Sequence, residues 1–365
     1  MLFCQCNLFN IDDGKNKDDT VYVAGYISFT NSFGTEFQFP TIWKNGEPTI
    51  LETNTGHANL IYVAGNDVYV VGRGNVVYYE NDILNVKPVA KIWKNGVGSV
   101  LFDTTTYSEA KSVFVSGTDV YVCGHVFPNL DGNSVATVWK NGIATYLTDG
   151  SYYAVANSVF VLNGDVYVAG YQRSSQYNVA KLWKNGIETD LTDGTIEDAE
   201  AKSVFVTNGN DVYVAGYSEM AGQNWTHNDY VKLWKNGIVN NLSDGTLNNA
   251  ALSLFVVDRN IYVAGVEYNS SQISVAKIWI NGVATDLSDG TQYAVANSIY
   301  VSNDDVYIAG WVSDTIMHAN VAKVWKNGNV VELNDETIIK TSGGASLDLS
   351  EGRISSYGNS VFVAN

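Results

Sequence analysis

The sequence predicts an all-β protein folded as one seven-bladed β-propeller with four antiparallel strands in each blade. Four short signatures each recur seven times in a fixed order along the 365 residues. Their composition is typical of strands and of the tight turns between strands. Successive copies follow at intervals of 44 to 51 residues, which is a spacing typical of propeller blades.

The signature Trp-Lys-Asn-Gly predicts a strand followed by a hairpin turn. It begins at Trp43, Trp93, Trp139, Trp183, Trp234 and Trp325, and reads Trp-Ile-Asn-Gly at Trp279. Asparagine and glycine readily accept the positive φ angles of a type I′ turn, so the chain should turn straight back into a further strand. Each repeated tryptophan is expected to bury about 150–250 Å² against the next blade.

Two further signatures predict buried strands. One is close to Val-Tyr-Val-Ala-Gly and begins at Val21, Val68, Val120, Val166, Val212, Ile261 and Val306. The other is close to Ser-Val-Phe-Val and begins at Leu60, Ser112, Ser158, Ser203, Ser253, Ser298 and Ser360. Both are apolar on both alternating faces, so each sheet needs cover on two sides. Stacking the sheets around one axis provides that cover.

The fourth signature, close to Leu-Thr-Asp-Gly, predicts the turn that leads from one blade into the next. It begins at Leu147, Leu191, Leu242 and Leu287, and survives in altered form at Leu51, Leu101 and Leu333. We interpret its aspartate as a turn cap. Calcium binding at these aspartates is the alternative.

The two chain ends are expected to close the ring. Val21 has no Ser-Val-Phe-Val copy before it, whereas the copy at Ser360 lies at the C-terminus. The C-terminal strand is therefore predicted to join blade one and so remove exposed sheet edges. A strand from residues 2–9 is the alternative. The expected units are an irregular extension at 1–19 and a propeller at 20–365. Blade one is expected to combine 20–53 with 358–365, and a connector at 336–357 precedes its last strand. Blades two to seven are expected at 58–103, 110–149, 156–193, 201–244, 251–289 and 296–335.

Charge and composition narrow the range of partners. The net charge is −17 and the pI is near 4.5, and such a surface repels phosphate backbones, so nucleic acid is not an expected partner. No stretch approaches the eighteen or more apolar residues of a membrane span. The first residues lack the basic and apolar regions of a recognisable signal peptide. We expect a monomer, with an extracellular or cell-surface location favoured.

The repeated blades, over residues 20 to 365, resemble bacterial propellers built from near-identical, duplicated blades. This resemblance implies the seven-bladed fold and lends no catalytic residues, because that family has no assigned activity. The blades lack the Gly-His and Trp-Asp pairs of WD repeats, the double glycine of kelch repeats and the Asp-box spacing of sialidases.

The sequence contains no recognisable catalytic or cofactor motif. A phosphate-binding glycine loop, His-Glu-x-x-His and Gly-x-Ser-x-Gly are all missing. The four histidines, His57, His125, His227 and His318, are expected in or beside loops on one face, as polar loop residues rather than metal ligands. We therefore predict no cofactor, no metal site and no catalytic residue.

One face of the propeller is the candidate ligand-binding face, because its loops between the second and third strands of each blade vary in length and content. The residue after Val-Tyr-Val-Ala-Gly ends a strand on this face and carries an aromatic ring in five of seven blades. Aromatic rings beside amides and hydroxyls are typical of sugar-binding surfaces. Rings that only cap the core between blades are the alternative. The candidate ligand-binding residues are Tyr26, His125, Tyr171, Tyr217, Trp225 and Trp311.

The residue before Ser-Val-Phe-Val is expected at the mouth of the central channel. The candidate channel-mouth residues are Asn59, Lys111, Asn157, Lys202, Asn297 and Asn359, with Leu252 in the remaining blade. A solvated polar ring is the simplest interpretation, and a small anion or polar ligand is the alternative.

Three classes of function remain open. The first is a non-catalytic binding module for a glycan or a protein, acting through the variable loops. The second is an enzyme of the lyase or hydrolase type with a site over the channel, since propeller enzymes assemble sites from scattered loops. The third is a purely structural surface protein. The lack of a clustered acid, base or nucleophile favours the binding module.

Overall fold

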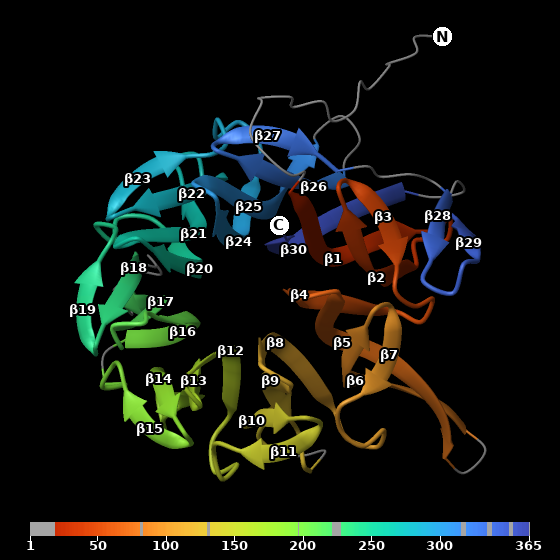
Figure 1. The fold of residues 1–365 in the computed structure, drawn as a ribbon, viewed down its shortest axis with the longest axis horizontal. Coiled ribbons are helices and arrows are strands. Elements are labelled where there is room, and N and C mark those ends of the chain that lie inside the picture. Colours follow the sequence, from red (N-terminus) through yellow and green to blue (C-terminus); the bar gives the residue numbers. More distant parts are fainter. Residues whose placement is uncertain are drawn as a thin grey trace.

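The computed structural model describes residues 19–80, 83–129, 132–195, 197–220, 228–314, 319–333, 338–349 and 353–364. Within these residues seven β-sheets surround a common axis (Figure 1). Six of the sheets contain four antiparallel strands, and the seventh contains six strands. The predicted seven-bladed propeller is therefore confirmed.

Blades two to seven each consist of four consecutive strands, with the first nearest the axis and the fourth at the rim (Figure 1). Blade two contains β4 (Gly56–Ala64), β5 (Asp67–Glu80), β6 (Ile83–Lys94) and β7 (Val97–Val100). Blade three contains β8 (Ser108–Ser116), β9 (Asp119–Val126), β10 (Val135–Lys140) and β11 (Ile143–Tyr146). Blade four contains β12 (Ala154–Leu162), β13 (Asp165–Arg173), β14 (Asn178–Lys184) and β15 (Ile187–Asp190). Blade five contains β16 (Glu197–Val206), β17 (Val212–Met220), β18 (Asn228–Lys235) and β19 (Ile238–Asn241). Blade six contains β20 (Asn249–Val257), β21 (Asn260–Tyr268), β22 (Ser274–Ile280) and β23 (Val283–Asp286). Blade seven contains β24 (Ala294–Ser302), β25 (Asp305–Asp314), β26 (Ala319–Lys326) and β27 (Asn329–Glu332).

Blade one combines both ends of the described chain. Its strands β1 (Thr20–Thr30), β2 (Glu36–Lys44) and β3 (Glu47–Ile50) are joined by the C-terminal strand β30 (Arg353–Ala364), which pairs antiparallel with β1. The predicted closure is thus confirmed. Residues 2–9, the alternative source of this strand, lie outside the described residues, and β30 occupies the position they would fill.

The expected connector at 336–357 is more structured than predicted. It contains the hairpin β28 (Ile338–Thr341) and β29 (Ser346–Asp348), and β28 runs parallel to β3 at the outer edge of blade one. Ile339 is fully buried in the core between blades one and seven. Burial of this apolar side chain explains why the segment pairs with the sheet instead of crossing the surface as a loop.

All seven repeated tryptophans are buried between blades, with exposed fractions of 0–1%. Each packs on the blade that precedes its own, which corrects the expected contact with the next blade. Trp183 of blade four, for example, packs with Tyr121 and Ala136 of blade three. Alternate residues of a strand point to opposite faces of its sheet, and the tryptophan occupies the face toward the preceding blade.

Side-chain hydrogen bonds join the innermost strands of neighbouring blades. At six boundaries between neighbouring blades, a serine hydroxyl oxygen accepts a hydrogen bond from a backbone N–H of the next blade. For example, Val159 N donates to Ser112 Oγ at 3.2 Å. Each inner strand also has a register shift just before its serine position, which leaves one residue out of the ladder. In four blades this residue is an asparagine whose amide donates to a backbone carbonyl of the next blade, namely Asn59, Asn157, Asn297 and Asn359.

The face that carries the tight turns, here called the turn face, is stabilised by a repeated polar arrangement. In blade three Asn141 has a φ of 51° and is followed by Gly142 at 81°. Its amide oxygen accepts the N–H of Val120 at 2.9 Å, and its nitrogen donates to Asp119 at 2.8 Å. Lys140 completes the arrangement with an ion pair to Asp119 at 2.7 Å.

The turn-cap interpretation of Leu-Thr-Asp-Gly is confirmed in the turn that follows β15, since Asp193 Oδ1 accepts the N–H and the hydroxyl of Thr195.

A closed ring of seven aromatic side chains surrounds the axis, with one from each innermost strand. Neighbouring ring centroids lie 4.6–5.2 Å apart. The members are Tyr62, Phe114, Phe160, Phe205, Phe255, Tyr300 and Phe362. Each lies between the irregular inner-strand residue and the tight turn, so the ring narrows the channel below its polar mouth.

Candidate ligand-binding face

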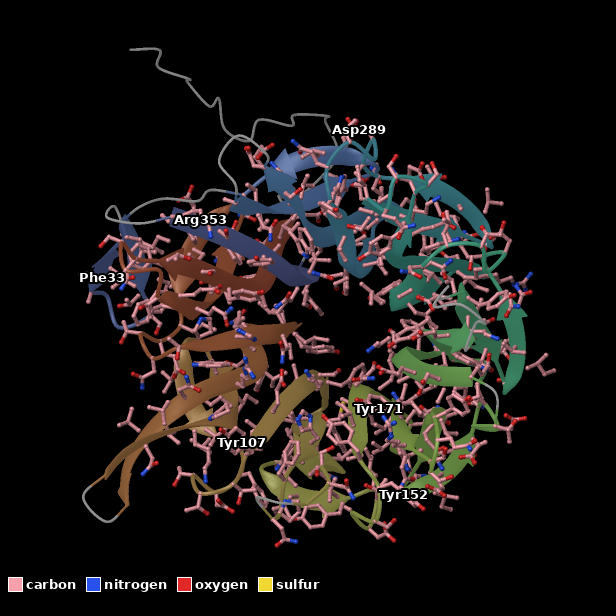
Figure 2. The ribbon with its side chains drawn as sticks, turned by 180° about the vertical axis from the view of Figure 1, so that it is seen from behind. Phe33, Tyr107, Tyr152, Tyr171, Asp289 and Arg353 are labelled. Atoms are coloured by element: carbon pink, nitrogen blue, oxygen red, sulfur yellow. The ribbon has the colours of Figure 1, made fainter. Side chains whose placement is uncertain are left out.

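The face opposite the turn face, here called the variable-loop face, carries the ends of the second strands and the beginnings of the innermost strands. Residues on these two strands pair directly, as in Tyr26 with Tyr357, Arg73 with His57 and Tyr171 with Val155. Figure 2 shows Tyr171 close to the central opening, whereas Tyr107 and Tyr152 lie farther out. The candidate ligand-binding residues that the structure describes lie on the second strands, one strand away from the axis.

Four aromatic side chains from blades seven, one and two form a continuous row. The ring of Tyr26 lies between His57 and Tyr357, with both centroids 4.5 Å away and interplanar angles of 24° and 17°. The edge of Trp311 meets Tyr357 at a centroid distance of 5.9 Å. Tyr26, Tyr357 and Trp311 are half-buried. Both faces of the Tyr26 ring are covered by its stacked neighbours, so a ligand can reach only the exposed edge of that ring.

A second aromatic row continues around the mouth through blades three and four. His125 meets Phe127 at 5.6 Å, Phe127 meets Tyr153 at 6.0 Å, and Tyr153 stacks on Tyr171 at 6.2 Å. In blade five the ammonium group of Lys202 lies 5.4 Å from the ring centroid of Tyr217. The candidates Tyr171 and Tyr217 thus belong to the same arc. Trp225 lies outside the described residues.

A polar cavity of about 390 Å³ opens between blades one and seven, next to the first aromatic row. Its lining includes Glu36, Asp314, Asn320, Arg353 and Tyr357, and Figure 2 shows Arg353 beside blade one. The amide of Asn320 donates to the Tyr357 hydroxyl at 2.6 Å. The cavity and the first aromatic row therefore share Tyr357.

The carboxylate of Glu36 is ionised in this cavity. Hydrogen bonds from Ser28 and Gln38 hold the pKa of Glu36 below its usual range. An ionised carboxylate is an acceptor only, so it suits the hydroxyl donors of a ligand.

A cluster of ionisable side chains lies at the channel mouth in blades two and three. Lys111 Nζ and Asn59 Nδ2 each lie 2.8 Å from the same oxygen of Glu109. Burial opposes ionisation of Glu109, but the charge of Lys111 and the hydrogen bonds outweigh it and lower its pKa to about 2. His125 faces Glu109 across the strands and is nine-tenths buried.

Both described histidines are neutral at physiological pH. Burial lowers the pKa of His125 to about 4. Burial, followed by the positive charge of Arg73, lowers the pKa of His57 to about 4. His57 lies at the start of β4 and His125 at the end of β9, which places both beside loops as expected. His227 and His318 lie outside the described residues.

The predicted channel-mouth residues have two different roles in the structure. The four asparagines donate to the neighbouring blade, so their amides hold the ring together. The two lysines form ion pairs, Lys111 with Glu109 and Lys202 with Glu200. Whether this mouth or the aromatic arc binds a ligand stays a prediction.

Sequence reasoning missed several residues that this face brings together. They are Glu36, Glu109, Glu200, Arg353 and Tyr357. One signal was available, because Glu-Ala-Lys precedes Ser-Val-Phe-Val in both blade three and blade five. In both blades the lysine of this tripeptide, which the register shift leaves out of the ladder, forms an ion pair with the glutamate.

The described residues contain no group of three or more His, Cys, Asp or Glu side chains that could hold a metal ion. They also contain no helix long and apolar enough to cross a membrane.

No protein-family model and no curated protein matches the sequence. The fold is similar to that of an acylaminoacyl peptidase from Pyrococcus horikoshii, with 12% identity and a TM-score of 0.51 over 88% of this chain and 52% of that one. This chain thus spans about half the length of the peptidase. The β-propeller domain of the Trilobed protease from Pyrococcus furiosus matches with 10% identity and a TM-score of 0.46, over 80% of this chain and 96% of that one. Trypanosoma rangeli sialidase matches with 10% identity and a TM-score of 0.44, over 84% of this chain and 57% of that one. These likenesses concern the propeller fold alone.

Proposed function

We propose that this protein is a non-catalytic module that binds a carbohydrate on its variable-loop face. The observation that carries the proposal is the row Trp311, Tyr357, Tyr26 and His57, which leads from the polar cavity to the channel mouth. Sugar rings present apolar C–H faces that pack on aromatic rings and hydroxyl groups that need hydrogen-bond partners. The row and the cavity offer both kinds of contact side by side.

The cavity is suited to a ligand of one or two sugar residues. Its volume of about 390 Å³ falls within the range of small-molecule sites. Carboxylates, an amide, a guanidinium group and hydroxyls line it. The lowered pKa of Glu36 keeps this carboxylate ionised, so that it can accept hydrogen bonds from ligand hydroxyls.

Two other expectations from the sequence remain proposals. Kinship with bacterial propellers of near-identical blades is supported by the repeats, and it would add no activity. A protein ligand on the same face would use the same aromatic side chains, which are also common at protein interfaces.

A glycan array tests this proposal. The parent protein should bind a defined set of glycans, and a Tyr26→Ala, Trp311→Ala variant should lose roughly tenfold or more in affinity, because it removes Trp311, on which stacking contributes about 0.5–1.5 kcal/mol, and the ring that holds His57 and Tyr357 in the row. Tyr146→Ala is the matched control, since Tyr146 is 49% exposed on the outer strand β11. Circular dichroism confirms that each variant is folded. A parent that binds no glycan, or a double variant that binds as well as the parent, overturns the proposal.

A further inference from the structure

Arg73 is the unpaired cation at the channel mouth. It follows the Val-Tyr-Val-Val-Gly copy of blade two directly. Its side chain is half-buried, and it pairs with His57 on the neighbouring strand. Among the described residues no carboxylate forms an ion pair with it. The two lysines of the mouth, in contrast, are neutralised by Glu109 and Glu200.

The surroundings of Arg73 keep its charge available to a ligand. Glu109, an acidic side chain of the cluster at the mouth, is held by Lys111 and Asn59. His57 is engaged by Gln38 through its Nε2 atom and by the Tyr26 ring. Neither histidine adds a charge at neutral pH. Lys111 is therefore balanced by Glu109, whereas Arg73 forms no ion pair with a described carboxylate, and the ionised Glu36 reaches His57 only through Gln38.

The position of Arg73 connects this charge to the aromatic row. Its cross-strand partner His57 is the end of that row and stacks on Tyr26 at 4.5 Å. A sugar bound along the exposed side of this row would thus extend toward the guanidinium group. Guanidinium groups bind carboxylates through two parallel hydrogen bonds, which neutral sugars cannot provide.

We propose that the ligand is an acidic carbohydrate, with the carboxylate of a uronic acid residue bound at Arg73. This inference rests on the proposed function and adds the class of ligand. The opposite end of the row is different, because the cavity contains Glu36 and Asp314 beside a single arginine, Arg353. That end suits the neutral part of the same oligosaccharide.

The test uses oligosaccharides in matched pairs, in which each uronic acid oligomer is compared with its carboxyl-reduced neutral counterpart by isothermal titration calorimetry. The parent should bind the acidic member roughly ten- to hundredfold more tightly, as expected for a charge-assisted hydrogen-bonded pair. Arg73→Gln should remove this preference, so that the acidic and the neutral member bind the variant with similar affinity. Arg259→Gln is the control, since Arg259 is exposed in the turn between β20 and β21 on the turn face.

The outcomes separate the two proposals. Equal affinity of the parent for both members would overturn the assignment of Arg73 and leave the carbohydrate function standing. Equal losses in Arg73→Gln and Arg259→Gln would show an effect of net charge alone and would also overturn it. Tighter binding of sulfated than of carboxylated oligomers would refute the carboxylate as the recognised group. A parent that binds no oligosaccharide would overturn both proposals.

Discussion

Asn359 donates a hydrogen bond of 2.9 Å from its side-chain amide to the backbone carbonyl of Ala58, and so ties the last strand of the chain to the second blade. On the other side Asn297 of blade seven donates to Gly358 at 2.9 Å. The same bond occurs inside the chain, between Asn157 and Ala201. The strand that closes the ring is therefore held by the same contacts as strands that are continuous with their neighbours.

Replacing Asn359 with alanine should lower the free energy of unfolding by about 0.5–1.5 kcal/mol, the usual net value of one hydrogen bond. Asn157→Ala should cost the same within error, because its bond has the same length and partner type. Urea denaturation followed by tryptophan fluorescence measures both. A neutral Asn359→Ala combined with a destabilising Asn157→Ala would contradict closure of the ring by β30.

Trp183→Ala should destabilise the protein by about 3–5 kcal/mol, because it leaves a cavity between blades three and four. Trp183 is fully buried against Tyr121, Cys123 and Ala136. Tyr146→Ala on the exposed outer strand should change the unfolding free energy by about 0.5 kcal/mol or less. Thermal and urea unfolding of the two variants give the comparison. Similar losses in both would show that the tryptophan does not anchor the boundary between blades.

The turn at Asn141 should respond differently to two substitutions. Asn141→Gly keeps the positive φ but loses the bonds to Val120 and Asp119, so we expect a loss of about 0.5–1.5 kcal/mol. Asn141→Asp keeps the acceptor for Val120 but places a second carboxylate against Asp119. It should therefore be less stable at pH 7 than at pH 4, relative to the parent. Stability of this variant that follows the parent at both pH values would contradict the assigned hydrogen bonds.

Stability should fall as the pH is lowered from 7 to 4. His125 has a pKa of about 4 in the folded protein and about 6.5 when unfolded. In this window the unfolded chain binds more protons, which costs roughly 3 kcal/mol at full effect. His57 acts in the same direction. Glu109, with a pKa of about 2, adds a further loss between about pH 4.5 and 2.

Urea denaturation at pH 7, 5 and 4 measures this dependence. The double variant His57→Gln, His125→Gln should show a shallower decline between pH 7 and 4 than the parent. An unchanged slope in that variant would mean that the two histidines are not held neutral in the folded protein.

The fold could be predicted because the repeats encode it directly. Seven Asn-Gly pairs mark the hairpins, and the copy at Ser360 without a following blade indicates the closure. The hairpin at Ile338 and Ser346 was missed because its strands are short and belong to no repeat. The side on which Trp183 packs was also not predictable, because the alternation of a strand does not say which neighbouring blade each face meets.

The candidate site could be predicted only in part. The position after Val-Tyr-Val-Ala-Gly indicated Tyr26 and Trp311, because every blade aligns there. Tyr357 and His57, which complete the row, lie on other strands, and their stacking depends on the register between chain segments far apart in sequence. The pairing of Glu109 with Asn59 crosses a blade boundary, and no spacing within one repeat shows such a contact.

Hydrogen–deuterium exchange of the intact protein, with and without a saturating uronic acid oligosaccharide, tests most directly whether the variable-loop face is the binding surface. Exchange should slow at the end of β1, in β4 near His57 and at the start of β30, and should stay unchanged at the Asn141–Gly142 turn. Protection confined to the turn face, or no change in exchange anywhere, would contradict carbohydrate binding on the variable-loop face.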